Sequence, residues 1–219
     1  MVAQQQPKVL SQDDYSESLM NQFEYIMIPI GIICGLAIAN LLGGYGKTVY
    51  RLSGRGSRIQ TSWVHTVWVL NTAFWIFAYW WYQFNLSELQ VWTLGSYLSS
   101  LVFPVVLYVQ TVILFPHRFD EIEDVGEYFL DTRIWFFGLL LLANGVDVLD
   151  GVFTSGLEYL TGLGTSLVVV VVGAVIASVV GMLTKNLRVH LAMGLLFFAA
   201  QVWQMFNDHP FLGARIPGG

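Results

Sequence analysis

The sequence has 219 residues, of which 55% are hydrophobic and 11% are charged, whereas an ordinary soluble domain has roughly 25% charged residues. This composition excludes a soluble globular protein. A net charge of −5, with only ten Lys and Arg residues, also excludes nucleic-acid binding, because the chain has no basic surface for a phosphate backbone.

Six apolar runs follow one another along the chain, and each is long enough to cross the roughly 30 Å hydrocarbon core of a bilayer as a helix. They predict an all-α integral membrane bundle that forms one domain, residues 23–206. The predicted spans are residues 23–45, 63–84, 91–115, 134–151, 163–183 and 191–206. Residues 1–22 lack the basic and apolar regions of a signal peptide and are predicted to be a flexible polar tail. Residues 207–219 form a short C-terminal tail.

The basic residues predict the orientation of the bundle. With the N-terminus outside, the connections 46–62, 116–133 and 184–190 face the cytoplasm. They hold Lys47, Arg51, Arg55, Arg58, Arg118, Arg133, Lys185 and Arg188. Only Lys8 and Arg215 then lie outside. Basic residues concentrate on the cytoplasmic side of membrane proteins, so we expect six spans with both termini on the outer side.

Small residues stand four apart in the first and fifth predicted helices, which allows neighbouring backbones to approach closely. They are Gly31, Gly35, Ala39 and Gly43 in the first, and Gly173, Ala177 and Gly181 in the fifth. Packing within the bundle is the favoured explanation, and a homo-oligomer seam is the alternative. The single cysteine, Cys34, permits no intramolecular disulfide and no cysteine-based metal site.

The second predicted helix has two distinct faces at 100° per residue. One face carries the polar and large aromatic residues His65, Trp68, Asn71, Thr72, Trp75, Tyr79, Tyr82 and Gln83. The other carries Val67, Leu70, Phe74, Phe77, Trp81 and Phe84. Polar groups must find partners inside a membrane bundle, so we expect the first face to point inward and the second to face lipid.

A polar stripe also follows the sixth predicted helix, through His190, Gly194, Gln201, Gln204 and Asp208. Hydrogen bonds between packed helices are one explanation. The other is a ligand cavity between the second, third and sixth helices. Its predicted lining is His65, Asn71, Gln110, His190, Gln201 and Gln204.

His65 and His190 begin the second and sixth predicted helices, at the same end of the bundle. Two histidines at equal depth are the arrangement that axial ligation of a b-type haem needs. Ordinary hydrogen bonds at the membrane boundary are the simpler explanation for both residues.

Ionisable residues are absent from the middle of the predicted spans. Asp147 lies 14 residues after Arg133, about 21 Å further along a helix, which puts it near the outer boundary. With Asp150, Glu24, Glu158 and Asp208 it forms an outer acidic ring. Solvation of these residues at the helix ends is the favoured explanation, and attraction of cations is the alternative. In the third predicted helix, Pro104, beside Ser99 and Ser100, is expected to loosen the helix and free a carbonyl. A structural kink is the favoured explanation for this proline.

The cytoplasmic connection 118–131 carries six acidic residues and is predicted to form a short amphipathic helix. An anionic leaflet repels such a segment, so we expect it to dock against the basic connection 46–62, for instance through Arg55 and Glu123. It is also a candidate surface for a protein partner.

Four sequence patterns are similar to those of a family of small polytopic bacterial membrane proteins without a known activity. They are Gly35-Leu36-Ala37 with Asn40-Leu41-Leu42, Trp63-Val64-His65-x-x-Trp68, Phe115-Pro116, and Arg133-x-Trp135-Phe136-Phe137. The resemblance covers roughly the first two thirds of the chain. It implies a helical bundle in a bacterial inner membrane, and it transfers no functional residue. The outer side, where the basic residues place both termini, is then the periplasm.

No catalytic arrangement stands out in the sequence. The function expected is therefore non-enzymatic: binding or transport of a small molecule, ion or lipid in a polar and aromatic cavity. One alternative is a haem-binding electron-transfer subunit that uses His65 and His190. Another is a scaffold or accessory subunit of a membrane complex.

Overall fold

The computed structural model describes residues 22–53, 60–88, 92–162 and 164–208. The two predicted tails lie outside these ranges, except for residues 22, 207 and 208, which belong to helices. In chain order the elements are α2 (Gln22–Leu52), α3 (Trp63–Gln83), η1 (Phe84–Glu88), α4 (Leu94–Ile113), η2 (Phe119–Glu121), α5 (Val125–Ser155), α6 (Glu158–Thr161), α7 (Thr165–Leu183) and α8 (Leu187–Asp208). The described chain is all-helical and contains no strand, as predicted.

Five helices, α2, α4, α5, α7 and α8, are long and apolar enough to cross a membrane. This is the pattern of a multi-pass membrane protein. Helix α3 is not among the five. It carries five tryptophans together with His65, Asn71 and Gln83, and these side chains lower its hydropathy.

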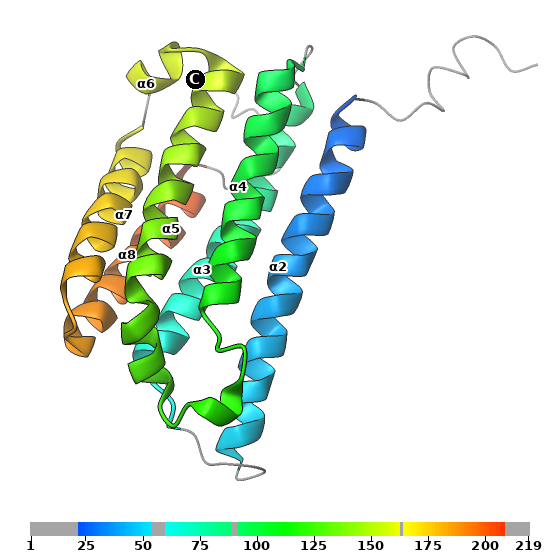
Figure 1. Ribbon diagram of the computed structural model, residues 1–219. Helices are drawn as coiled ribbons and strands as arrows, with labels where there is room; N and C mark the ends of the chain where they lie inside the picture. The colour runs from blue at the N-terminus through cyan, green and yellow to red at the C-terminus, as the bar shows by residue number, and fades with distance from the viewer. Residues whose placement is uncertain (1–21, 54–59, 89–91, 163, 209–219) are drawn as a thin grey trace, which may run out of the picture.

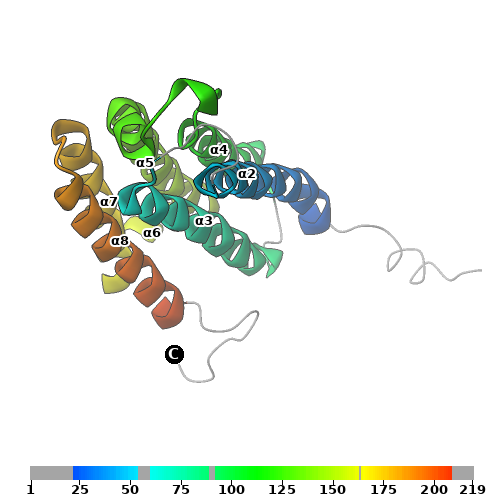
Figure 2. The same ribbon diagram turned by 90° about the horizontal axis from the view of Figure 1, so that it is seen from below.

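The six long helices form a closed ring of neighbours (Figures 1 and 2). Around the ring, α2 contacts α4, α4 contacts α5, α5 contacts α7, α7 contacts α8, α8 contacts α3, and α3 contacts α2. Helix α3 also contacts α4 and α5, so it lies closer to the middle of the bundle than the others. The buried polar side chains of α3, among them His65, Asn71 and Gln83, therefore have several neighbouring helices from which to find partners.

The two faces predicted for α3 are observed. Trp68 is fully buried, with its ring centroid 5.0 Å from that of Phe137 and 5.5 Å from that of Phe136. Six residues of the inward face are buried, and the other two, Trp75 and Tyr82, are partly buried. On the opposite face Leu70 and Phe77 are exposed.

The two stripes of small residues differ in their surroundings. On α7, Ala177 and Gly181 are buried, and a Cβ on Gly181 would lie 2.6 Å from the Phe137 ring. On α2, Gly35 and Gly43 are exposed, and a Cβ there would meet nothing within 4 Å. The α7 stripe therefore serves packing within the bundle. The role of the exposed stripe on α2 as an oligomer seam stays a prediction.

The helix boundaries at the end of the bundle where α5 begins differ from those of the predicted elements. Helix α5 starts at Val125, nine residues before the predicted span, because the Asp124 carboxylate accepts hydrogen bonds from the backbone N–H groups of Gly126 and Glu127 at 2.6 and 3.4 Å. An aspartate at this position satisfies N–H groups that lack partners within the helix. The predicted amphipathic helix is therefore the short η2 followed by the first two turns of α5.

The connections that precede α3 and α5 contact each other as expected, but largely through backbone groups. The Gln60 N–H donates to the Glu123 carbonyl at 2.8 Å, and the Val125 N–H donates to the Gln60 carbonyl at 3.0 Å. The Arg51 guanidinium also lies 3.6 Å from the Asp120 carboxylate. Arg55, named above as a docking residue, lies outside the described residues.

Candidate functional site

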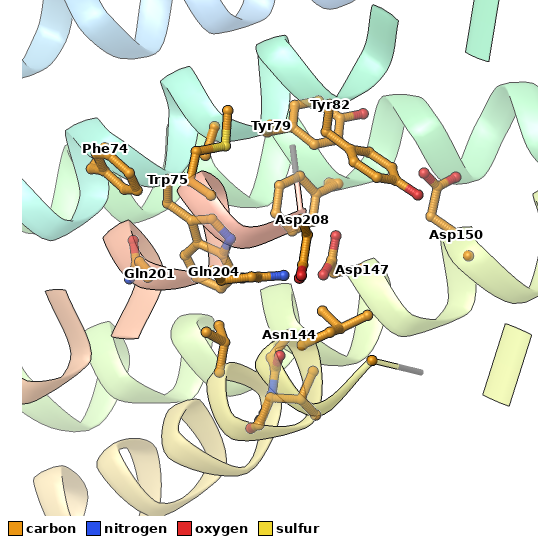
Figure 3. A pocket seen from close by; sticks show the side chains of 18 of the residues that line it. Phe74, Trp75, Tyr79, Tyr82, Asn144, Asp147, Asp150, Gln201, Gln204 and Asp208 are labelled. Atoms are coloured by element: carbon orange, nitrogen blue, oxygen red, sulfur yellow. Dashed lines mark hydrogen bonds between the residues drawn. The ribbon is translucent and has the colours of Figure 1, made fainter. Parts of the chain in front are cut away.

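A cavity of about 270 Å³ lies inside the bundle, among α3, α5, α7 and α8, near the end where α5 ends and α7 begins (Figure 3). Its polar lining consists of Asn144, Asp147, Asp150, Gln201, Gln204 and Asp208. Its aromatic lining consists of Phe74, Trp75, Tyr79, Tyr82, Phe103 and Tyr159. Small-molecule sites typically combine apolar and aromatic walls with a few polar groups in this way.

The acidic residues of this region correct the prediction of a solvated outer ring. Asp150 is only 6% exposed. Its carboxylate accepts hydrogen bonds from the Ser99 and Ser100 hydroxyls of α4 at 2.5 and 3.0 Å. Asp208, the last residue of α8, accepts from the Ser166 hydroxyl in the first turn of α7 at 2.6 Å. These two carboxylates therefore join neighbouring helices, whereas Glu24 and Glu158 are exposed as expected.

Asp147 differs from the other two acids. It is one helical turn before Asp150 on α5, it is half-buried, and its carboxylate points into the cavity (Figure 3). It makes no hydrogen bond to any residue that the structure describes. An ionisable group within a membrane span is costly unless it is paired or faces a polar cavity, so the placement of Asp147 marks this cavity as a candidate site.

The carbonyl predicted to be freed by Pro104 belongs to Ser100, four residues earlier. The Tyr79 hydroxyl on α3 donates a hydrogen bond to it at 2.5 Å. Tyr79 is thereby fixed in the cavity wall, and its ring also packs at 4.5 Å from that of Phe103.

Tyr159 covers the cavity from the short helix α6. The backbone turns after α5 at Gly156, whose φ of 76° is a conformation that glycine adopts readily. The returning chain places the Tyr159 ring so close to Gly151 that a Cβ on Gly151 would overlap it. Burial raises the pKa of the Tyr159 hydroxyl, and Asp147, Tyr82 and Asp150 add to this shift. The hydroxyl therefore stays protonated at neutral pH.

Two of the six residues predicted to line a cavity do so. Gln201 and Gln204 on α8 belong to the lining. Asn71 lies behind Gln201, whose amide nitrogen is 3.4 Å from the Asn71 side-chain oxygen. Asn71 itself donates to the Gly194 and Val67 carbonyls at 3.0 and 2.8 Å, so it joins α3 to α8.

The other three predicted residues lie away from this cavity. His65 is fully buried, with its Nε2 atom 2.7 Å from the Leu114 carbonyl oxygen and its ring against Phe115. His190 is also fully buried, with Nε2 3.1 Å from the Thr184 carbonyl oxygen and its ring stacked on Phe137. Gln110 is buried on α4, and its amide has no hydrogen-bond partner among the described residues. The prediction of a haem held by the two histidines stays a prediction.

The sequence interpretation missed the contribution of α5. Asn144, Asp147 and Asp150 stand three apart, a spacing that puts them on one side of a helix, and this pattern was visible in the sequence. Within the described residues, no three His, Cys, Asp or Glu side chains are grouped so that they could hold a metal ion.

Comparisons of the chain with protein-family models, with characterised proteins and with solved structures found no significant match.

Proposed function

We propose that this chain is a non-enzymatic, six-span protein of a bacterial inner membrane that binds or transports a small molecule in the cavity described above. The observation that carries the proposal is the cavity itself, into which the half-buried Asp147 carboxylate points. A volume of about 270 Å³ is near the lower end of the roughly 300–1,000 Å³ of ligand pockets. It suits a small ligand better than a whole lipid.

The proposal treats α3 as the sixth span. Its 21 residues extend about 32 Å at 1.5 Å per residue, which matches a hydrocarbon core of about 30 Å. Its polar side chains point into the bundle and its apolar face is exposed, as lipid contact requires.

The proposed orientation, with both termini periplasmic, rests on the distribution of charge. Helices α3, α5 and α8 begin at one end of the bundle (Figure 1), and eight of the ten Lys and Arg residues lie toward this end, within residues 46–62, 116–133 and 184–190. Basic residues favour the cytoplasmic side. The cavity then lies toward the periplasmic side.

A cavity-filling variant tests the proposal. Ala78 lines the cavity from α3, so Ala78→Phe fills part of it. Ala199→Phe adds the same ring on the exposed face of α8 and is the matched control. The melting temperature of each purified full-length protein is measured in detergent with cationic, neutral, anionic and zwitterionic small molecules.

The expected result is a compound that stabilises the wild type and Ala199→Phe but not Ala78→Phe, because ligands that bind the folded state raise its apparent stability. If Ala78→Phe does not fold, Ala78→Leu fills the cavity less severely. If no compound of any class distinguishes a folded filled variant from the control, the proposed function is wrong.

A further inference from the structure

All the charged residues described in the lining of the cavity are acidic. Three carboxylates line it, and none of the described residues in the lining is Lys, Arg or His. Asp150 and Asp208 each accept hydrogen bonds from serine hydroxyls, but Asp147 makes none with the described chain. A carboxylate in such a place is best satisfied by a cation, since burial of an unpaired charge is expensive.

The side-chain oxygen of Gln201 is a second buried acceptor without a hydrogen-bond donor in the described chain. Gln201 is only 4% exposed. Its amide nitrogen is directed to Asn71, and its side-chain oxygen Oε1 has no hydrogen-bond partner among the described residues. Buried acceptors of this kind normally have a partner in the protein, in ordered water or in a ligand. The cavity thus presents two kinds of acceptor, a carboxylate and an amide oxygen.

The aromatic walls add attraction for positive charge. Trp75 and Tyr79 are held in place by Phe103, with ring centroids 5.5 and 4.5 Å away. Tyr82 and Tyr159 approach from α3 and α6, and in Figure 3 Tyr82 lies on the same side of the cavity as Tyr79. The faces of Trp and Tyr rings attract ammonium groups, and clusters of them recognise quaternary ammonium ions.

We infer that the cavity binds a small organic cation, an ammonium ion with a compact apolar body, with Asp147 as its counter-charge and the Trp75, Tyr82 and Tyr159 rings as its walls. This inference rests on the proposed function and adds the ligand class. An anionic ligand is disfavoured, because three carboxylates and no basic group of the described residues line the cavity. A bare metal ion does not match a cavity of about 270 Å³ whose walls are largely aromatic.

Choline and 3,3-dimethylbutan-1-ol are suitable probes, because they have nearly the same shape and only choline is charged. Binding to the purified full-length protein in detergent is measured by isothermal titration calorimetry at low salt. The expected result is saturable binding of choline and at least tenfold weaker binding of the alcohol. Asp147→Asn should weaken choline binding at least tenfold, whereas Asp147→Glu should retain most of it.

Glu158→Gln is the matched control. It removes one negative charge at the same end of the bundle from an exposed residue outside the cavity lining, and choline affinity should change less than twofold. Trp75→Leu should weaken choline binding while the charge is kept, which supplies a second test if both Asp147 variants fail to fold.

The outcomes separate this inference from the proposed function. Equal binding of the two probes, or unchanged choline affinity in Asp147→Asn or Trp75→Leu, overturns the inference. If neutral or anionic compounds instead bind and are blocked by Ala78→Phe, the proposed function survives and only the ligand class is wrong. If Ala78→Phe blocks the binding of no compound, both the inferred ligand class and the proposed function are wrong.

Discussion

The hydroxyl of Tyr79 on α3 donates a hydrogen bond to the backbone carbonyl of Ser100 on α4, at a distance of 2.5 Å. In a regular helix this carbonyl accepts from the N–H of the residue four positions later. That residue is Pro104, which has no N–H. The tyrosine of one helix therefore replaces a bond that the other helix cannot make, and both residues are buried.

Tyr79→Phe keeps the ring and removes this donor, so the Ser100 carbonyl is left without its partner. We expect a loss of roughly 1 kcal/mol in the free energy of unfolding, in the range of hydrogen bonds between membrane helices. The measurement is unfolding of the purified protein in mixed micelles of increasing SDS content.

Pro104→Ala restores an N–H four residues after Ser100, and the double variant Tyr79→Phe/Pro104→Ala should be more stable than Tyr79→Phe alone. A double-mutant cycle isolates this coupling. If the two substitutions are simply additive, the proposed replacement of one bond by the other is wrong.

The helix packing near α7 makes a second prediction. A Cβ on Gly181 would lie 2.6 Å from the Phe137 ring, whereas a Cβ on Gly173 would meet the Phe197 ring at an ordinary 3.9 Å. We expect Gly181→Ala to destabilise the protein by roughly 1–3 kcal/mol, the usual cost of overfilling a packed core, and Gly173→Ala to change stability little. Similar melting temperatures for both variants would contradict the close contact of α5 and α7 at Gly181.

The sequence predicted the helices and the orientation of α3 well, because helical periodicity separates polar from apolar faces when one face must avoid lipid. It did not predict which helices are neighbours. The expected cavity lay between α3, α4 and α8, whereas the observed one takes most of its polar groups from α5 and α8. Spacing along one helix does not contain the information on which other helix packs against it.

The sequence-based prediction that the outer acidic residues are all solvated was wrong for a different reason. The estimate of about 21 Å from Arg133 to Asp147 treated the end of a helix as open to water. In the structure the chain turns at Gly156 and Tyr159 returns over Gly151, so the end of α5 is covered. The contacts of Asp150 with Ser99 and Ser100 also depend on the packing of α4 against α5, which a single sequence does not show.

At the other end of the bundle, we expect the two residues of the Arg51–Asp120 ion pair to contribute unequally to the stability of the protein. Arg51 is 21% exposed and Asp120 is 63% exposed. The Arg51 guanidinium also donates to the Phe119 carbonyl at 3.2 Å. Exposed ion pairs contribute about 0–1 kcal/mol, so Asp120→Asn should have a small effect on the melting temperature. Arg51→Ala should lower it clearly more, because the carbonyl contact is lost as well. Equal effects would mean that the ion pair, and not the carbonyl bond, holds the connection.

The two buried histidines allow a direct test of the haem alternative. Each ring already uses its Nε2 atom at a backbone carbonyl, His65 at Leu114 and His190 at Thr184, and each packs against phenylalanine rings. Ligation of iron through Nε2 requires both of these contacts to be broken. The Nδ1 atoms have no hydrogen-bond partner among the described residues, but they are buried, so ligation through them also requires the aromatic packing to open. We therefore expect the protein purified from cells supplied with haem to show protein absorption only, in both the oxidised and the reduced state.

His65→Ala and His190→Ala should then lower the melting temperature without changing the visible spectrum. A Soret band that is lost in either variant would contradict this expectation and would assign the two histidines to electron transfer.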